Sequence, residues 1–127
     1  MIAFFTDNSS DILLKTWEHF YISIIALFLG VIFAIPLGIF LSKTKTIAKI
    51  VLAITSVFQT LPSLAILAIM IPFLGVGKVP AIVALFIYTL LPILNNTYIG
   101  LKSVNADLRK TGISMGMTPL QSIWMVE

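Results

Sequence analysis

The sequence predicts an all-α membrane protein with three transmembrane helices followed by a cytoplasmic helix–glycine–helix element. Three observations lead to this fold class. Hydrophobic residues fill 59% of the 127 positions and charged residues only 10%, whereas a soluble domain has about 25% charged residues. The charged residues leave three long apolar runs between them. A helix–glycine–helix pattern then follows the third run.

Each apolar run exceeds the roughly 20 residues that a helix needs to cross a bilayer. The runs are continuous rather than alternating, which excludes the strands of a membrane barrel. The second run is expected to form one helix followed by a turn at Pro72, Gly75 and Gly77. The expected organisation is an extracellular segment 1–18, a membrane region 19–101 with spans at about 19–42, 48–72 and 79–101, and a cytoplasmic segment 102–127.

Basic residues near the spans predict the orientation. The opening residues MIAFFTDNSSD contain no basic residue, and the first apolar run is too long for a signal peptide, so it is expected to remain as a span. Six basic residues lie between the first and second spans or after the third span, which places them on one side of the membrane. The other two lie on the opposite side with the N-terminal acidic residues. Because basic residues favour the cytoplasm, the N-terminus is expected outside and the C-terminus inside the cell membrane. The six are Lys43, Lys45, Lys49, Lys102, Arg109 and Lys110.

Composition excludes several classes of function. The chain has no cysteine and one histidine, His19, so we expect no metal site. The GxxxxGK pattern of a phosphate-binding loop would need glycine where Pro72 stands. We therefore expect no catalytic residue and no cofactor in this chain, and any ATP chemistry must belong to another chain. The net charge of +3 is spread along an apolar sequence and does not indicate a nucleic-acid surface.

The first expected span has a ridge of small residues spaced four apart. They are Ala26, Gly30, Ala34, Gly38 and Ser42. On a helix this spacing places them on one face, where small side chains let two membrane helices approach closely. The alternative is that alanine and glycine are simply common in apolar helices. Pro36 lies within the ridge and is expected to kink the helix.

Polar residues interrupt the other two spans. They are Gln59, Thr60 and Ser63 with Pro62 in the second span, and Asn95 and Asn96 in the third. A buried amide without a partner costs a few kcal/mol, so Gln59 should face other helices or water. Thr60 and Ser63 either repair the break at Pro62 or line a translocation pathway, and both readings stay open. The two asparagines are either interfacial or line an inner vestibule.

The segment after the third span has helix boundary signals in order. Asn105 can cap a first helix, and Gly116 suits the left-handed residue that closes it. Thr118 and Gln121 then form a capping box, with Pro119 at the first helical position. The second helix presents an apolar face of Leu120, Ile123 and Trp124. This element could lie on lipid, imitate a DNA-binding helix-turn-helix, or dock a cytoplasmic partner.

Two stretches resemble a known family. KTGISMGMTPLQSIWMVE is similar to the cytoplasmic EAA loop of bacterial ABC-importer permeases, with Gly116 at the motif glycine. Lys110, Thr111 and Gly112 occupy the E-A-A positions, so the acidic and alanine signature is absent. VFQTLPSLAILAIMIPFLGVGKVPAIVALFIYTLLPILNNTYIGLKSVN closely resembles permease subunits for the osmoprotectants glycine betaine, carnitine and choline. The resemblance extends from about Lys15 to Glu127.

The resemblance implies the N-terminal part of a type I ABC importer permease fold. It implies a bacterial membrane subunit that forms the solute pathway, docks an ATPase that binds ATP and magnesium, and pairs with a second permease subunit and a solute-binding protein. Phe58 and Tyr88 are candidates to hold a quaternary ammonium by cation–π attraction. The implied ATPase-docking residues are Lys110, Thr111, Gly112, Gly116, Thr118, Pro119, Leu120, Ile123 and Trp124.

The family pattern places Leu-Pro and further spans after Glu127, so we expect either a truncated gene product or a fragment of a longer permease. The alternative function is a structural or regulatory membrane protein that transports nothing.

Overall fold

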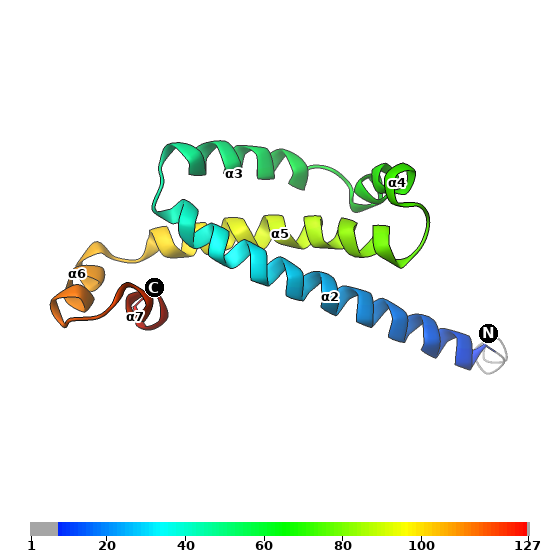
Figure 1. Cartoon of the computed structure of the whole chain (residues 1–127), viewed down its shortest axis with the longest axis horizontal. Coiled ribbons are helices and arrows are strands. Elements are labelled where there is room, and N and C mark those ends of the chain that lie inside the picture. The colour runs from blue at the N-terminus through cyan, green and yellow to red at the C-terminus, as the bar shows by residue number, and fades with distance from the viewer. Residues whose placement is uncertain (1–7, 127) are drawn as a thin grey trace.

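The computed structural model describes residues 8–126, and every regular element in this range is an α-helix. The all-α prediction is confirmed. Figure 1 shows two long helices, α2 and α5, side by side, with α3 and α4 along one flank and the short α6 and α7 at one end. The helices are α2 (Ser9–Ser42), α3 (Thr46–Gln59), α4 (Ser63–Leu74), α5 (Lys78–Ser103), α6 (Ala106–Ser114) and α7 (Pro119–Met125).

Helices α2 and α5 form the main packing unit and run in the same direction. A Cβ atom built on Gly30 would lie 3.4 Å from Cβ of Thr89, and one on Gly38 would lie 2.8 Å from Cβ of Thr97. Eight residues along α2 therefore correspond to eight residues along α5. Because the two helices are parallel, the chain must return between Ser42 and Lys78 to the end where it started, and α3 and α4 make this return (Figure 1).

The second expected span differs from the single helix predicted over 48–72. Helices α3 and α4 are separate and are bent by 96° relative to one another. The reason lies at Pro62, which has no N–H to continue the helical bonds and adopts an extended backbone with φ −60° and ψ 139°. Thr60 Oγ1 donates a 2.6 Å hydrogen bond to the Val57 carbonyl oxygen, as the repair reading expected.

The other two spans lie close to their predicted positions. Helix α5 covers the third span with a small extension at each end, whereas α2 begins at Ser9, ten residues before the expected start at His19. By length and composition, α2 and α5 can each cross a membrane alone, and α3 with α4 adds a third crossing if the bent pair counts as one span. The first seven residues of the expected extracellular segment, and Glu127, lie outside the described range.

Helix α2 is longer than a bilayer requires. Its 34 residues correspond to about 51 Å at the helical rise, against roughly 30 Å of hydrocarbon. Near its N-terminal part, Glu18 Oε1 accepts a 3.1 Å salt bridge from Lys78 Nζ at the start of α5. This ion pair joins the N-terminal half of α2 to the first residue of α5.

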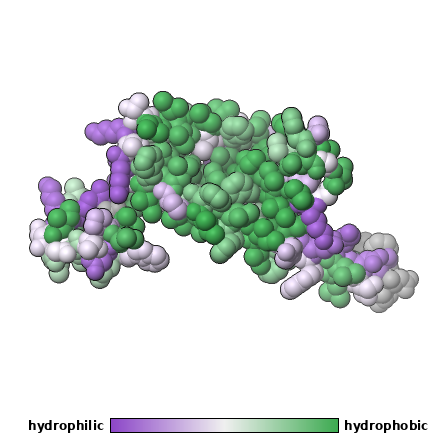
Figure 2. Space-filling view, in the orientation of Figure 1, coloured by the Kyte–Doolittle hydropathy of each residue, from purple (hydrophilic) through white to green (hydrophobic). Residues whose placement is uncertain are grey.

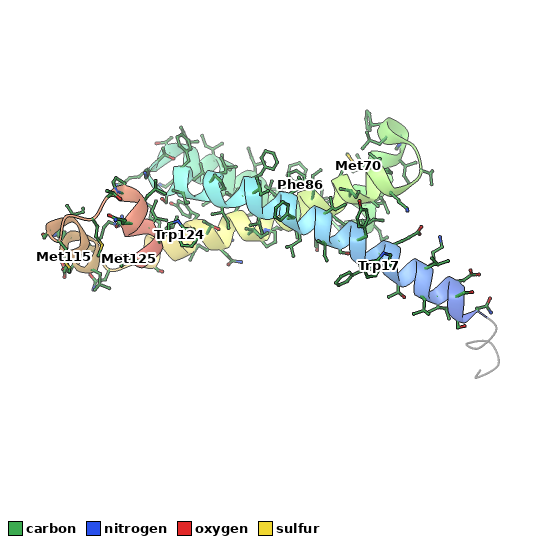
Figure 3. All side chains as sticks on the ribbon, turned by 60° about the horizontal axis from the view of Figure 1, so that its bottom comes forward. Trp17, Met70, Phe86, Met115, Trp124 and Met125 are labelled. Carbon is green, nitrogen blue, oxygen red and sulfur yellow. The ribbon has the colours of Figure 1, made fainter. Side chains whose placement is uncertain are left out.

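The surface is apolar along the middle and polar at both ends. The small core consists of Ala34, Leu41, Ala48 and Leu94, so most large apolar side chains on the helices are exposed. Figure 2 shows them as a continuous hydrophobic body between two hydrophilic ends. Trp17 lies toward one end and Trp124 toward the other (Figure 3). Such a surface is suited to lipid or to neighbouring helices and not to water.

Candidate functional site: the α6–α7 element and the α3–α4 break

The element that follows α5 is built by local hydrogen bonds that the sequence predicted. The Asn105 side chain accepts a 2.9 Å bond from the backbone N–H of Asp107 and caps α6. At the other end, Gly116 has φ +80°. Its N–H donates to the Ile113 carbonyl oxygen at 2.9 Å, and Met117 N–H donates to Gly112 at 3.2 Å. This pair of bonds is the Schellman closure of a helix, which confirms Gly116 as the terminating residue.

Helix α7 starts at Pro119 with a complete capping box. The backbone N–H of Gln121 donates to Thr118 Oγ1 at 3.3 Å. The backbone N–H of Thr118 donates to Gln121 Oε1 at 2.8 Å. Pro119 is the first helical residue, where its missing N–H costs nothing. Local hydrogen bonds of Gly116, Thr118 and Gln121 thus define the turn between α6 and α7.

The apolar face predicted for α7 is divided between two environments. Leu120 and Trp124 are 70% and 84% exposed. Ile123 is half-buried and faces cavities on the side of the long helices. Figure 3 shows Met115 at the end of α6 and Met125 on α7, and both are exposed. The element therefore exposes four large apolar side chains, those of Met115, Leu120, Trp124 and Met125, together called the α6–α7 patch hereafter.

The residues at the E-A-A positions have different surroundings. Lys110 and Thr111 are exposed, whereas Gly112 is buried. A Cβ on Gly112 would lie 3.3 Å from Met117 Sδ and 3.3 Å from Val126 Cγ2. Gly112 therefore lies where α6 packs against the residues that flank α7. Among the three E-A-A positions, it is the buried one.

The break between α3 and α4 lies beside a cavity of about 320 Å³. Ser63 and two leucines of α4 line it together with His19 of α2 and Tyr88 of α5. Its remaining lining is aliphatic. Gln59, Thr60 and Pro62 are exposed at the break, so the structure places Ser63, but not these three, in the cavity lining. The volume is at the lower end of the range for small-molecule sites.

The two asparagines of α5 belong to a different region. Asn95 is half-buried, and Asn96 is exposed and lines a cavity of about 250 Å³ with Thr97 and Gly100. This cavity lies at the end of α5 that leads to α6. The structure therefore does not bring the polar residues of the second span together with those of the third.

The small-residue ridge is buried against α5. Ala26, Gly30, Ala34 and Gly38 are all buried. Thr97 Oγ1 donates a 2.7 Å bond to the Ile93 carbonyl oxygen of its own helix, which leaves its methyl group to meet Gly38. Thr89 bonds to Leu85 in the same way. Both hydroxyls are satisfied locally, so the interface between the helices is apolar.

A family model fits most of the chain. Residues 26–127 match the binding-protein-dependent transport system inner membrane component family. The chain belongs to this family. The match covers α3 to α7 and all of α2 from Ala26 onward, so it includes both the break and the α6–α7 element.

Three relatives of this inner membrane component are similar over its whole length. The choline transport system permease protein OpuBB of Bacillus subtilis is 52% identical over 127 residues. The carnitine transport permease protein OpuCB of Listeria monocytogenes is 51% identical, and the glycine betaine/carnitine/choline permease protein OpuCB of Bacillus subtilis is 54% identical. In each case the match covers 100% of this chain but 58% of the relative, so the chain spans somewhat over half of their length.

Sequence reasoning missed three features of this inner membrane component. It did not pair the ridge with Thr89 and Thr97, although these two threonines repeat at the spacing of Gly30 and Gly38. It placed His19 at the outer end of a span without connecting it to Ser63, because the cavity that both residues line depends on the bend between α3 and α4. It gave no signal for the 3.1 Å bond from Arg109 Nη2 to the Leu101 carbonyl oxygen.

Proposed function

We propose that this chain is the membrane-spanning part of an ATP-driven importer for quaternary-ammonium osmoprotectants such as glycine betaine, carnitine and choline. Its role is to form the solute pathway and to dock an ATPase subunit that binds and hydrolyses ATP. Family membership and the similarity to choline, carnitine and glycine betaine permease proteins support this function. The observation on which it depends most is the rigid α6–α7 element with its exposed α6–α7 patch.

The α6–α7 patch is suited to docking because the two helices that carry it are already ordered before a partner binds. Two caps and a Schellman closure fix the turn, so little conformational entropy is lost when a partner binds. The exposed Leu120 and Trp124 are spaced four apart on α7 and can enter a groove as helix anchors. Large buried aromatic side chains dominate binding energy at interfaces, so Trp124 is the proposed main anchor.

The proposed pathway passes the cavity beside the α3–α4 break. Ser63 and Tyr88 supply polar groups, and the aliphatic lining suits a solute with a bulky apolar cation. Tyr88 can attract a quaternary ammonium through its ring face. Phe58 precedes the break and is 44% exposed, which leaves it available to a second helix bundle.

The charged residues described between His19 and Leu101 lie near helix ends. Lys43, Lys45 and Lys49 lie in and after the α2–α3 turn, and Lys78 starts α5. The helix interiors hold no ionisable pair of the kind used for proton coupling.

The proposed assembly contains two permease subunits, two ATPase subunits and an extracellular or periplasmic solute-binding protein. We propose that the N-terminal end of α2 faces outside and that α6 and α7 face the cytoplasm, as the distribution of basic residues favours. Closure of the ATPases on ATP would move α6 and α7 as one body and tilt the long helices. The bent α3–α4 pair would then change the width of the pathway.

Co-purification with the ATPase tests the docking role. A tagged chain that replaces the native one in its host should retain the ATPase subunit. Gly116→Val should abolish this retention, because valine disfavours φ +80° and the turn would open. Ser114→Val places the same residue two positions earlier, at an exposed helical site, and should retain the ATPase.

Retention of the ATPase by Gly116→Val at the wild-type level would contradict the docking role. A chain that inserts normally but retains no ATPase in any form would support the structural or regulatory alternative. Uptake of labelled choline, carnitine and glycine betaine by the same cells tests the proposed substrates separately.

A further inference from the structure

A third cavity lies between the end of α2 and the α6–α7 element. Its volume is about 440 Å³. One side is formed by the last residues of α2, and the other by α6, α7 and the turn between them. It is lined by Ser42, Lys43, Arg109, Ile113, Met117, Pro119, Ser122 and Ile123.

The polar part of this lining suits an anion. It contains one ammonium, one guanidinium and two hydroxyl groups, and it contains no carboxylate. Arg109 Nη2 is fixed by its 3.1 Å bond to the Leu101 carbonyl oxygen at the end of α5. The arginine side chain is thus held near the junction of α5 and α6. Arginine and lysine held in this way form charge-assisted hydrogen bonds with phosphate oxygens.

The apolar part of the lining continues toward the membrane. Ile123 lines this cavity and also the 250 Å³ cavity between the long helices. Besides Ile123, the 250 Å³ cavity is lined by Ile35 and Ile39 of α2 and by Asn96, Thr97, Gly100 and Leu101 of α5. It is open to the side, and no atom lies within 4 Å of a Cβ built on Gly100. A cationic cavity therefore adjoins an apolar groove that runs along the lipid-facing helices.

This combination identifies the kind of ligand. A free phosphate would use only the cationic end and would leave the adjoining groove empty. An anionic phospholipid has both parts, a phosphate headgroup and an acyl chain, in the required order. Basic pockets between membrane helices are known sites for such headgroups. The α2 helix ends at Ser42, so the cationic end also lies where the apolar body gives way to the hydrophilic end (Figure 2).

We propose that this cavity binds the headgroup of one anionic phospholipid, with an acyl chain in the groove lined by Ile39 and Gly100. The lipid would join the end of α2 to α6 and α7. These two short helices pack on each other, and their contact with the long helices is sparse. A bound lipid would therefore hold the α6–α7 element at a defined position below the spans. This site does not depend on the proposed substrate or on the ATPase.

Native mass spectrometry of the purified chain tests this site, with phosphatidylglycerol and phosphatidylcholine as probes. The wild-type chain should retain one phosphatidylglycerol molecule in preference to phosphatidylcholine. Lys43→Gln should lower retention of phosphatidylglycerol about fivefold, the factor expected for the loss of one cation beside an anionic lipid. Lys43→Arg should restore it. Lys43 is exposed, so we expect its substitution to preserve the fold, which the helix content by circular dichroism checks.

Two controls separate this site from general attraction of lipid to basic protein. Lys45→Gln removes the same charge two residues later, at a position that does not line the cavity, and should retain phosphatidylglycerol like the wild type. Gly100→Leu keeps every charge but fills the groove and should lower retention. Inorganic phosphate alone should not displace the lipid.

Three results would overturn the proposal. The first is equal retention of the two lipids by the wild-type chain. The second is an equal loss for Lys43→Gln and Lys45→Gln, which would indicate nonspecific electrostatic attraction. The third is displacement by inorganic phosphate, which would indicate a simple anion site without a place for the acyl chain.

Discussion

At the scale of single residues, α2 and α5 lie very close to one another at Gly38. A Cβ atom at this position would lie 2.7 Å from Cγ2 and 2.8 Å from Cβ of Thr97. Thr97 cannot turn away easily, because Cβ is fixed to the backbone and its hydroxyl bonds to Ile93. Glycine is therefore required here by space and not by backbone conformation.

Gly38→Ala should destabilise the chain by about 1–3 kcal/mol, because the two long helices must separate to admit one methyl group. Gly100→Ala is the matched control on α5, since nothing lies within 4 Å of its Cβ position. It should be neutral or stabilising by up to about 1 kcal/mol, the difference in helix propensity. Denaturant unfolding of both variants in detergent measures the effect. Equal stability of the two variants would contradict the close packing.

The ridge of small residues was readable from the sequence because its spacing of four is the period of a helix face. Its partner surface on α5 was not, because the sequence does not determine the register of α5 against α2. Gly30 shows why the ridge does not reveal which glycine is required by space. It belongs to the same ridge, but its Cβ position is 3.4 Å from Thr89, an ordinary contact, so the ridge alone could not show which glycine is essential.

At the scale of elements, α7 depends on its cap. The helix extends over seven residues, too few to be stable by propensity alone. Thr118 and Gln121 satisfy backbone groups at its start. Because the α6–α7 patch includes Trp124 of this helix, the cap also determines how the proposed docking surface is presented.

Thr118→Ala should weaken α7 by about 0.5–2 kcal/mol, the usual cost of losing such a cap. Amide hydrogen exchange of residues 121–125 should accelerate by roughly 2- to 30-fold. Thr111→Ala is the control, because Thr111 Oγ1 bonds only to the Asp107 carbonyl oxygen within α6. Unchanged exchange in Thr118→Ala, or the same change in both variants, would show that the cap does not hold α7.

The caps of α6 and α7 were predictable because each depends on residues within three or four positions of one another. The bend between α3 and α4 was predicted only in part. Pro62 indicated a weak point, but the size of the bend depends on how α4 meets α5, which sequence periodicity does not report. Placing Ser63 beside His19 needed that angle as well.

At the scale of the whole molecule, the parallel arrangement of α2 and α5 determines the number of crossings. Contacts between residues 18 and 78, 30 and 89, and 38 and 97 all advance in the same direction along both helices. The chain must therefore cross back between them. We therefore expect the bent α3–α4 pair to be one crossing rather than a re-entrant loop, and the two ends of the described chain to lie on opposite sides of the membrane.

Labelling of single cysteines tests this topology most directly, since the chain contains no cysteine of its own. Ser10→Cys lies near the start of α2, and Ser114→Cys ends α6; both positions are exposed. In intact cells without an outer membrane barrier, a membrane-impermeant maleimide should label Ser10→Cys and should label Ser114→Cys only after the membrane is opened. Labelling of both positions in intact cells, or of neither, would place the two ends on one side and contradict three crossings with an internal α6–α7 element.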